Sequence, residues 1–270
     1  ATIVQRTGRN PMILKVKVVL VTGAGAGIGE AITIAMAEAG AQVVSADIDG
    51  AAAQKTADAA AAFQTKTLAL ETDVGNVAEI DAMVDRTVDA FGRLDIIVNN
   101  AGVTRRAYIM DLTEEDWDRI HRVNAKGVFF CLQRAARTMI AQGEGRIINI
   151  ASIAGRGYAG TSNAAYAASK GAVIALTKTA SQQLGPHNIN VNAICPGVTR
   201  TPLSDRNLAV RAEEQGVSLE EALKNHLKPI PIGRANQAED IAAMAVFLAS
   251  PGARNITGQA YNVDGGLVLS

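Results

Sequence analysis

The sequence predicts a single, doubly wound α/β domain in which a parallel sheet of about seven strands is covered by helices on both faces. Short β-branched runs alternate with alanine-rich segments of helical spacing along most of the 270 residues. This rhythm is typical of a parallel sheet with right-handed crossovers. The first such run, residues 16–21, leads through a glycine-rich turn into a helical segment. Because 48% of the residues are apolar and 19% are charged, the chain can bury a substantial core.

Each strand is predicted from a short apolar run that ends in small or polar residues, and each helix from apolar positions three or four residues apart. The predicted strands are residues 16–21, 42–46, 65–70, 94–98, 145–150, 189–194 and 258–263. The predicted helices are residues 30–39, 50–62, 76–91, 113–141, 162–184, 208–215, 219–228 and 238–249. Thr113 is predicted to cap the long helix that follows it, because acidic residues fill the next positions.

Composition argues against several classes of function. The 26 basic and 26 acidic residues balance, so nothing indicates binding to nucleic acid. The only cysteines, Cys131 and Cys195, fit neither a disulfide framework nor a metal site, so we expect a reduced, cytoplasmic setting and no metal. No apolar run reaches the roughly 18 residues of a membrane span, so we expect no membrane association.

The turn after the first strand reads Thr22-Gly-Ala-Gly-Ala-Gly-Ile-Gly29. Gly23, Gly27 and Gly29 permit a tight turn and let the backbone approach a ligand closely, and the helix that follows offers N–H donors and the positive end of its dipole. The turn therefore predicts a site for the pyrophosphate of a dinucleotide. Its spacing, Gly-x-x-x-Gly-x-Gly, differs from the usual Gly-x-Gly-x-x-Gly, so this prediction depends on the strand–turn–helix context.

Asp47 ends the second predicted strand, about 20 residues after the glycine turn, where an acidic side chain can accept hydrogen bonds from an adenosine ribose. A carboxylate there would repel a 2′-phosphate, and the glycine turn contains no Arg or Lys that could bind one. Both observations favour NAD over NADP. The alternative is that Asp47 caps the next helix, although Asp49 fits that role better.

Residues 1–12 are polar and irregular, and we expect an extension or tag remnant there. Residues 13–270 are then one dinucleotide-binding and catalytic domain. Residues 203–232 interrupt the alternation of strands and helices. Because ligands bind at the carboxyl ends of the strands in open parallel sheets, this insertion after the strand at 189–194 is predicted to be a substrate lid.

Tyr166 and Lys170 lie four residues apart in an alanine-rich run, so a helix would place them on one face. An ammonium beside a phenol favours the phenolate and lowers a pKa that is ordinarily about 10. The spacing is common by chance and carries little weight alone. Asn124 stands in the middle of a predicted helix, where an Asn is unfavourable by propensity and calls for a reason.

Taken together, these motifs resemble the short-chain dehydrogenase/reductase family, in its single-domain form with a Rossmann-type fold. The resemblance covers about residues 14–268 and includes, in chain order, the glycine turn, Asn99-Asn100-Ala101-Gly102, Asn124, Ser152, Tyr166-x-x-x-Lys170 and Cys195-Pro196-Gly197. It implies an NAD-dependent oxidoreductase that transfers a hydride between a secondary alcohol or ketone and the cofactor.

The resemblance also implies roles for four catalytic residues. Tyr166 would be the general base in alcohol oxidation and the general acid in ketone reduction. Lys170 would lower the pKa of Tyr166 and bind the nicotinamide ribose. Ser152 would hydrogen-bond the substrate oxygen, and Asn124 would hold a water that links Lys170 to solvent.

Cofactor contacts are implied for residues of the glycine turn and of the strand ends. They are Gly23, Gly27, Ile28, Gly29, Asp47, Asp73, Val74, Asn100, Ala101, Gly102, Tyr166, Lys170, Pro196, Gly197, Thr199 and Thr201. Asp73 and Val74 would flank the adenine, and Thr201 would contact the carboxamide. The resemblance further implies a homotetramer, with the helices around 113–141 and 162–184 at one subunit interface.

The substrate is less well defined than the reaction. Candidate contacts are Thr104, Arg105, Ala154, Arg156 and Asn163. Relatives that bind small 3-hydroxy acids usually carry His and Lys where Ala154 and Asn163 stand here, which disfavours such acids. Arg105 or Arg156 could receive a carboxylate, but we expect each to be a solvated surface residue. Asn163 and Thr104 suit hydroxyl recognition, which favours a polyol, sugar or sugar acid over a compact cyclic alcohol.

Two other functions stay open. An NADP-dependent carbonyl reductase of the 3-oxoacyl type would use the same catalytic residues, but Asp47 and the neutral glycine turn argue against it. A catalytically silent dinucleotide sensor could share the fold, because fold does not determine function. Such a protein typically lacks a catalytic residue, whereas all four are present here.

Overall fold

The fold is seen in a computed structural model that describes residues 12–158, 160, 162–201, 204, 208–210, 212–213 and 216–269. Seven strands form one parallel sheet in the order β3-β2-β1-β4-β5-β6-β7, which confirms the predicted fold class. The strands are β1 (Val18–Thr22), β2 (Gln42–Asp47), β3 (Thr67–Glu71), β4 (Ile96–Asn99), β5 (Gly145–Ile150), β6 (Ile189–Pro196) and β7 (Ala260–Val263).

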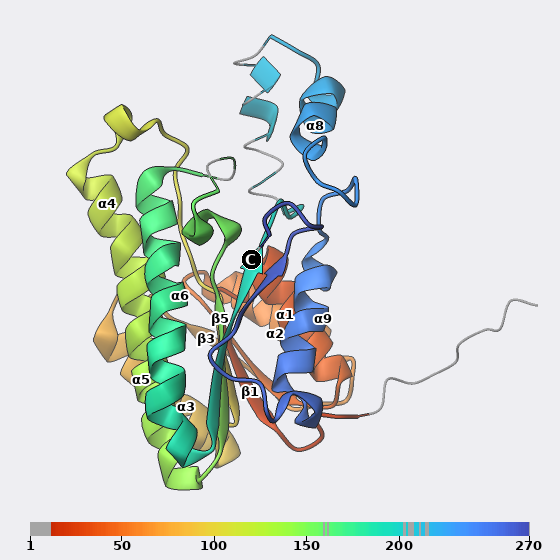
Figure 1. The fold of residues 1–270 in the computed structure, drawn as a ribbon. Coiled ribbons are helices and arrows are strands. Elements are labelled where there is room, and N and C mark those ends of the chain that lie inside the picture. Colours follow the sequence, from red (N-terminus) through yellow and green to blue (C-terminus); the bar gives the residue numbers. More distant parts are fainter. Residues whose placement is uncertain are drawn as a thin grey trace, which may run out of the picture.

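Helices cover both faces of this sheet (Figure 1). The helices α1, α2 and α9 lie on one face, and α3, α4, α5 and α6 lie on the other. Their bounds are α1 (Gly27–Glu38), α2 (Gly50–Ala61), α3 (Val77–Phe91), α4 (Glu114–His121), α5 (Val128–Gln142), α6 (Ala164–Leu184), α8 (Leu219–Leu227) and α9 (Ala238–Ala249). Short helical turns lie between them, namely η1 (Ile109–Asp111), η2 (Arg122–Gly127), η3 (Ile153–Arg156), η4 (Gly185–His187) and η5 (Pro251–Ala253).

Local sequence explains where several helices begin. The Asp49 carboxylate accepts a hydrogen bond from the Ala52 amide at 3.0 Å, so Asp49 caps α2 as expected. Thr113 and Asp116 form a reciprocal capping box at the start of α4. Each cap satisfies N–H groups that the first helical turn leaves without partners.

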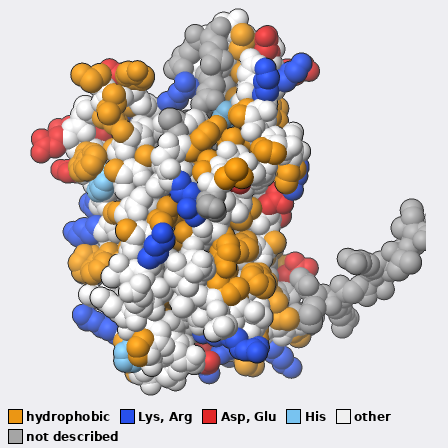
Figure 2. Space-filling model, in the orientation of Figure 1, with side chains coloured by type: hydrophobic (Ala, Val, Ile, Leu, Met, Phe, Trp, Pro, Cys, Tyr) orange, Lys and Arg blue, Asp and Glu red, His pale blue; other side chains and the backbone are white. Residues whose placement is uncertain are grey.

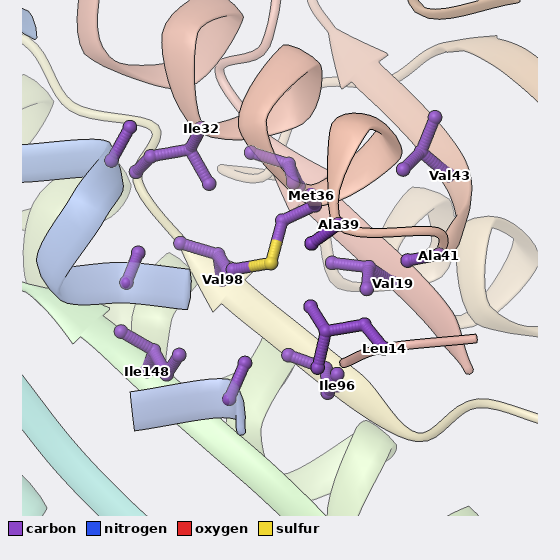
Figure 3. Close-up of a cluster of buried hydrophobic side chains, with 14 of the residues drawn as sticks. Leu14, Val19, Ile32, Met36, Ala39, Ala41, Val43, Ile96, Val98 and Ile148 are labelled. Atoms are coloured by element: carbon purple, nitrogen blue, oxygen red, sulfur yellow. The ribbon is translucent and has the colours of Figure 1, made fainter. Parts of the chain in front are cut away.

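One core cluster fills the space between the sheet and the layer of α1 and α9 (Figure 3). Ile32 and Met36 of α1 point toward Val98 of β4, and all three side chains are fully buried. A second cluster, with Leu20 of β1 near its centre, fills the opposite face beneath α3 and α5. Because both faces are covered, the central strands β1 and β4 are almost entirely apolar, which is why they were predictable from sequence.

The long helix predicted over residues 113–141 is divided in the structure. α4 and α5 are joined by η2, a π-helical turn that contains Asn124. Four strands, β1, β3, β4 and β7, begin two residues later than predicted, and β6 ends two residues later. The extension expected at residues 1–12 lies outside the described residues except for Met12, and the helix expected at 208–215 lies partly outside them. The helix expected at 219–228 is α8. Within the described residues, no helix is long and apolar enough to cross a membrane.

The order of the strands reverses at β1, which pairs with β2 on one side and β4 on the other. At such a point the connections leave toward opposite faces, so a crevice opens at the carboxyl ends of the strands. At the opposite end of the sheet, where β1 and β4 begin, lies the Asp95 carboxylate, which is 3% exposed. Asp95 accepts hydrogen bonds from the Val18 amide at 2.8 Å, Arg93 Nη2 at 2.5 Å and Lys17 Nζ at 3.3 Å.

We expect Asp95→Ala to lower the free energy of unfolding by about 2 kcal/mol, because it leaves the buried Val18 N–H without its acceptor and leaves Lys17 and Arg93 with Glu144 as their remaining partner. Asp85→Ala is the matched control: Asp85 pairs with Arg134, its side chain is 60% exposed, and its loss should cost less than about 1 kcal/mol. Urea unfolding followed by circular dichroism measures both. Equal losses in the two variants would contradict this role for Asp95.

Candidate active site

Tyr166 and Lys170 lie in the first two turns of α6, where Asn163 fixes the start of the helix. The Asn163 Oδ1 accepts a hydrogen bond from the Tyr166 amide at 2.8 Å and so caps α6. The Lys170 Nζ is 5.8 Å from the centre of the Tyr166 ring. The predicted pair therefore shares one helix face, with the ammonium close enough to act on the phenol.

Lys170 is only 3% exposed, and its Nζ donates a hydrogen bond to the Ile150 carbonyl at the end of β5 at 2.7 Å. Burial lowers the pKa of Lys170 to about 8. Burial also raises the pKa of Tyr166, and a hydrogen bond from Ser152 acts in the opposite direction. The structure thus brings Ser152, Tyr166 and Lys170 together at the carboxyl end of β5.

Asn124 is fully buried within the π-helical turn η2. Its Oδ1 accepts a hydrogen bond from the Val103 amide at 2.8 Å. Its Nδ2 donates to the Val103 carbonyl at 2.9 Å and to Ser169 Oγ at 3.1 Å. The side chain therefore joins the loop after β4 to the helix that carries Tyr166, which accounts for an amide at an unfavourable helical position. Single π-helical turns within α-helices frequently mark functional sites.

The glycine turn is tied to the end of β4 by Thr22 and Asn100. Asn100 Nδ2 donates to the carbonyls of Thr22 at 3.0 Å and Gly23 at 2.9 Å, and Thr22 Oγ1 accepts from the amides of Asn100 and Ala101 at 3.1 Å. A Cβ at Gly23 would stand 2.7 Å from Ala101 Cα, and Gly23 has a φ of +64°. This position therefore accepts glycine only.

Asp47 faces the same turn. Its Oδ2 accepts a hydrogen bond from the Gly25 amide at 2.8 Å, and its Oδ1 accepts from the Asp49 amide at 3.0 Å. A Cβ at Gly25 would come within 2.7 Å of Ala52 Cβ and 3.0 Å of the Asp47 carboxylate. The glycine backbone leaves room for a ligand beside the Asp47 carboxylate, and the N-terminus of α1 offers N–H donors. This is the combination of shape and donors that binding of a dinucleotide requires.

Most of the other expected cofactor residues fall into two groups, whereas Gly27, Gly29 and Ala101 belong to neither. Ile28, Asn100, Gly102, Pro196, Gly197, Thr199 and Thr201 line a cavity of about 760 Å³, together with Tyr166 and Lys170. Val74 is buried, and the Asp73 carboxylate is bound by Arg122 Nη1 at 2.9 Å and by the Gly75 amide at 2.8 Å. The Arg122 hydrogen bond lowers the pKa of Asp73 despite its partial burial.

Of the five expected substrate residues, Thr104 and Arg105 line this cavity. Ala154, Arg156 and Asn163 are not among its lining residues. Arg156 donates to the Ala260 carbonyl of β7, and the Asn163 side chain is used to cap α6 and to bind the Arg105 carbonyl. The Asn163 side-chain amide is therefore already hydrogen-bonded within the chain and is not free for the hydroxyl recognition that we expected of it.

Arg105 does not offer a free cation, because the Asp116 carboxylate binds it in a fork. Arg105 Nε lies 2.9 Å from both Asp116 oxygens, and Nη2 lies 2.6 Å from Oδ2. The hydrogen bond between them raises the pKa of Arg105 and lowers that of Asp116. The carboxylate recognition that we expected of Arg105 as one alternative is thus already satisfied within the chain.

Sequence reasoning missed Ser162, Tyr108 and His226, which also line the cavity. Ser162 lies four residues before Tyr166, so a search for hydroxyls between Ser152 and Tyr166 would have found it. Tyr108 is 74% exposed at the cavity mouth, in the segment before α4 where Figure 2 shows apolar side chains at the upper left. His226 belongs to α8, which projects at the top of Figure 1. Among the described residues, no three or more His, Cys, Asp or Glu gather to hold a metal ion.

The low pKa of Lys170 predicts how the free energy of unfolding changes with pH. Below pH 8 the lysine is protonated in both the folded and the unfolded chain. Between about pH 8 and the ordinary value of 10.5, the folded chain has lost a proton that the unfolded chain still holds, so the free energy of unfolding rises with pH. Relative to Lys170→Met, the wild type should therefore gain up to about 3 kcal/mol across this window. Parallel unfolding curves of the two proteins at pH 7 and 10 measure it, and a constant difference would contradict a buried ammonium.

Comparison with known proteins agrees with this geometry. A family model described as enoyl-(acyl carrier protein) reductase matches residues 23–268. The chain is 42% identical over 232 residues to a sorbitol dehydrogenase of Cereibacter sphaeroides, covering 86% of this chain and 89% of that protein. It is 38% identical over 231 residues to a 3-oxoacyl-(acyl-carrier-protein) reductase of Thermotoga maritima, covering 85% and 89%.

Solved structures of related enzymes also match the chain over most of its length. The crystal structure of an NAD⁺-bound xylitol dehydrogenase superposes with a TM-score of 0.88 at 32% identity, covering 94% of this chain and 99% of that one. A short-chain type dehydrogenase/reductase from Mycobacterium marinum gives a TM-score of 0.87 at 35% identity, covering 97% and 99%. On its sequence, its seven-stranded sheet and these matches, the chain is an oxidoreductase that belongs to the short-chain dehydrogenase/reductase family.

Proposed function

We propose that the protein is an NAD-dependent dehydrogenase of a secondary alcohol, with a polyol or sugar as its substrate class. The observation that carries this proposal is the meeting of Ser152, Tyr166 and buried Lys170 at one cavity, beside the glycine turn. The sorbitol dehydrogenase and xylitol dehydrogenase among the similar proteins support an alcohol of this class.

In this proposal the side chains bind, orient and move a proton. The Ser152 hydroxyl holds the substrate oxygen next to the Tyr166 Oη, which takes the hydroxyl proton during oxidation and returns it during reduction. Lys170, as an ammonium, favours the phenolate against the effect of burial. The nicotinamide, when bound, accepts or donates the hydride.

The preference for NAD rests on Asp47. Its carboxylate already accepts one hydrogen bond from the glycine turn and keeps further lone pairs for ribose hydroxyls. A 2′-phosphate at the same position would meet like charge, which costs several kcal/mol across an interface. The residues that would hold the rest of the cofactor are those of the glycine turn, the end of β4 and the segment after β6.

The second candidate is an NADP-dependent 3-oxoacyl reductase. The relative from Thermotoga maritima and the description of the matching family model favour it. The two candidates share their catalytic residues and differ at the adenosine ribose and in the substrate, so the test of Asp47 below separates them.

We also propose that residues 203–232 act as a substrate lid and that the chain forms a homotetramer through the surfaces of α4, α5 and α6. Phe129 and Ile140 of α5 are each 41% exposed, which supports an apolar contact surface there. α8, within the proposed lid, contributes His226 to the cavity.

Tyr166→Phe should lower kcat at least 1,000-fold while NADH affinity changes less than about threefold, because only the phenolic proton is removed. The assay is NAD reduction over a panel of polyols, sugars, hydroxy acids and cyclic alcohols, with NADH binding followed by fluorescence. Tyr158→Phe is the matched control, since Tyr158 packs in a neighbouring apolar cluster, and should retain full activity.

Substantial turnover by Tyr166→Phe would overturn the role of the phenol. Lys170→Ala is the informative contrast, because it should weaken both turnover and NADH binding. A wild-type enzyme that oxidises no alcohol of the panel with NAD would overturn the proposed function itself.

NADH should bind at least about 30-fold more tightly than NADPH, and Asp47→Ala should reduce that ratio to within about fivefold, because it removes the charge that repels a 2′-phosphate. Fluorescence titration with both nucleotides measures the ratio. Asp49→Ala, which removes the neighbouring carboxylate that caps α2, should leave the ratio unchanged. Equal affinities in the wild type would favour the NADP-dependent candidate.

A further inference from the structure

We propose that Thr104 and Ser162 form a hydroxyl pair that recognises a second hydroxyl or keto group on the carbon next to the reacting one. The pair selects neutral polyhydroxylated substrates and rejects hydroxy acids. This inference rests on the proposed function and narrows its substrate class.

The two hydroxyls face the same space as the catalytic groups. Thr104 lies in the loop after β4 and Ser162 in the loop before α6, and both line the cavity that Ser152 and Tyr166 line. Thr104 Oγ1 and Ser162 Oγ are 2.5 Å apart and hydrogen-bonded. Both side chains are partly exposed, so the pair is open to a ligand in the cavity.

The pair is held in a fixed relation to Tyr166. Asn163 caps α6 through its Oδ1 and donates from its Nδ2 to the Arg105 carbonyl, with Thr104 Oγ1 also within 3.5 Å. The same amide side chain therefore sets the start of the catalytic helix and the position of the loop that carries Thr104. A ligand bound by the hydroxyl pair is thereby placed relative to the phenol.

Hydrogen-bond counting defines what the pair can recognise. Two hydroxyls have two protons and four lone pairs. Their mutual hydrogen bond uses one proton and one lone pair, whichever of the two donates, so one proton and at least two lone pairs remain even after the Asn163 contact. A partner that both accepts and donates, which is a hydroxyl, uses both remaining functions, and a keto oxygen uses the proton.

A carboxylate suits this position poorly. It only accepts hydrogen bonds and needs at least two donors or a cation to replace its hydration. The pair offers one donor, and the adjacent Arg105 is already bound by Asp116 and by the Asp111 carbonyl at 2.7 Å. A hydroxy acid would therefore lose hydration without a matching partner from these residues.

The test compares 2-butanol with two compounds that each differ from it at one carbon next to the reacting one, as resolved stereoisomers. These are 2,3-butanediol, with a hydroxyl on C3, and 2-hydroxybutanoate, with a carboxylate in place of the C1 methyl group, and all three are assayed with NAD. The wild type should show a kcat/KM for the diol at least tenfold above that for 2-butanol and at least 100-fold above that for the acid. Ser162→Ala and Thr104→Val should each bring the kcat/KM for the diol to within about threefold of that for 2-butanol.

Three controls separate recognition by the hydroxyl pair from other effects of the substitutions. The double variant should lose no more than either single one, because the two hydroxyls act as a unit. Ser162→Thr, which keeps the hydroxyl, should retain the preference for the diol. Thr67→Val, a matched change in β3 far from the cavity, should alter nothing, and NADH binding checks that every variant is folded.

A wild type that oxidises 2-butanol as well as the diol, or variants that lose both substrates equally, would overturn this inference and leave the proposed function standing. A wild type that oxidises the acid best would overturn it as well. A wild type inactive with NAD on these three compounds and on the broader alcohol panel would overturn the proposed function and this inference with it.

Discussion

The close contact between α6 and the segment after β5 is the constraint on which the site depends. A Cβ at Gly155 would stand 2.6 Å from the Lys170 carbonyl carbon and 2.7 Å from the Gly171 amide, so only a glycine lets the two backbones approach this closely. At that distance Lys170 reaches the Ile150 carbonyl, and Ser152 reaches Tyr166. A larger residue would move the helix away from the strand end and separate Tyr166 from Ser152 and Lys170 from the Ile150 carbonyl.

The rest of the site follows from the reversal of strand order between β1 and β4. The glycine turn leaves β1 on one side of the crevice, and the loop with Thr104 leaves β4 on the other. Thr22 and Asn100 hold the two loops together at their base, so the glycine turn and the loop after β4 cannot shift independently. The cavity that results is lined from both sides.

Much of the fold could be predicted from the sequence. Strands buried on both faces are continuous β-branched runs, and caps such as Asp49 and Thr113 are local signals, so strands, helices and topology class were accessible. The π-helical turn around Asn124 was not, because it depends on packing against the loop after β4. Nor could the sequence tell that Arg156 turns toward β7 while Ser162 faces the cavity, since the direction of a loop side chain depends on the path of the whole loop.

The double role of the Asn163 side chain limits how such an enzyme can acquire new substrates during evolution. One side chain positions the catalytic helix and also the loop that carries Thr104. A change at Asn163 would therefore disturb both segments at once, so a gain in binding a new substrate would come with a displacement of Tyr166. Ser162 lies next to it but contributes no bond to the helix cap. Evolution or laboratory selection can vary Ser162 at little risk, so new specificities should arise there while Asn163 stays constrained.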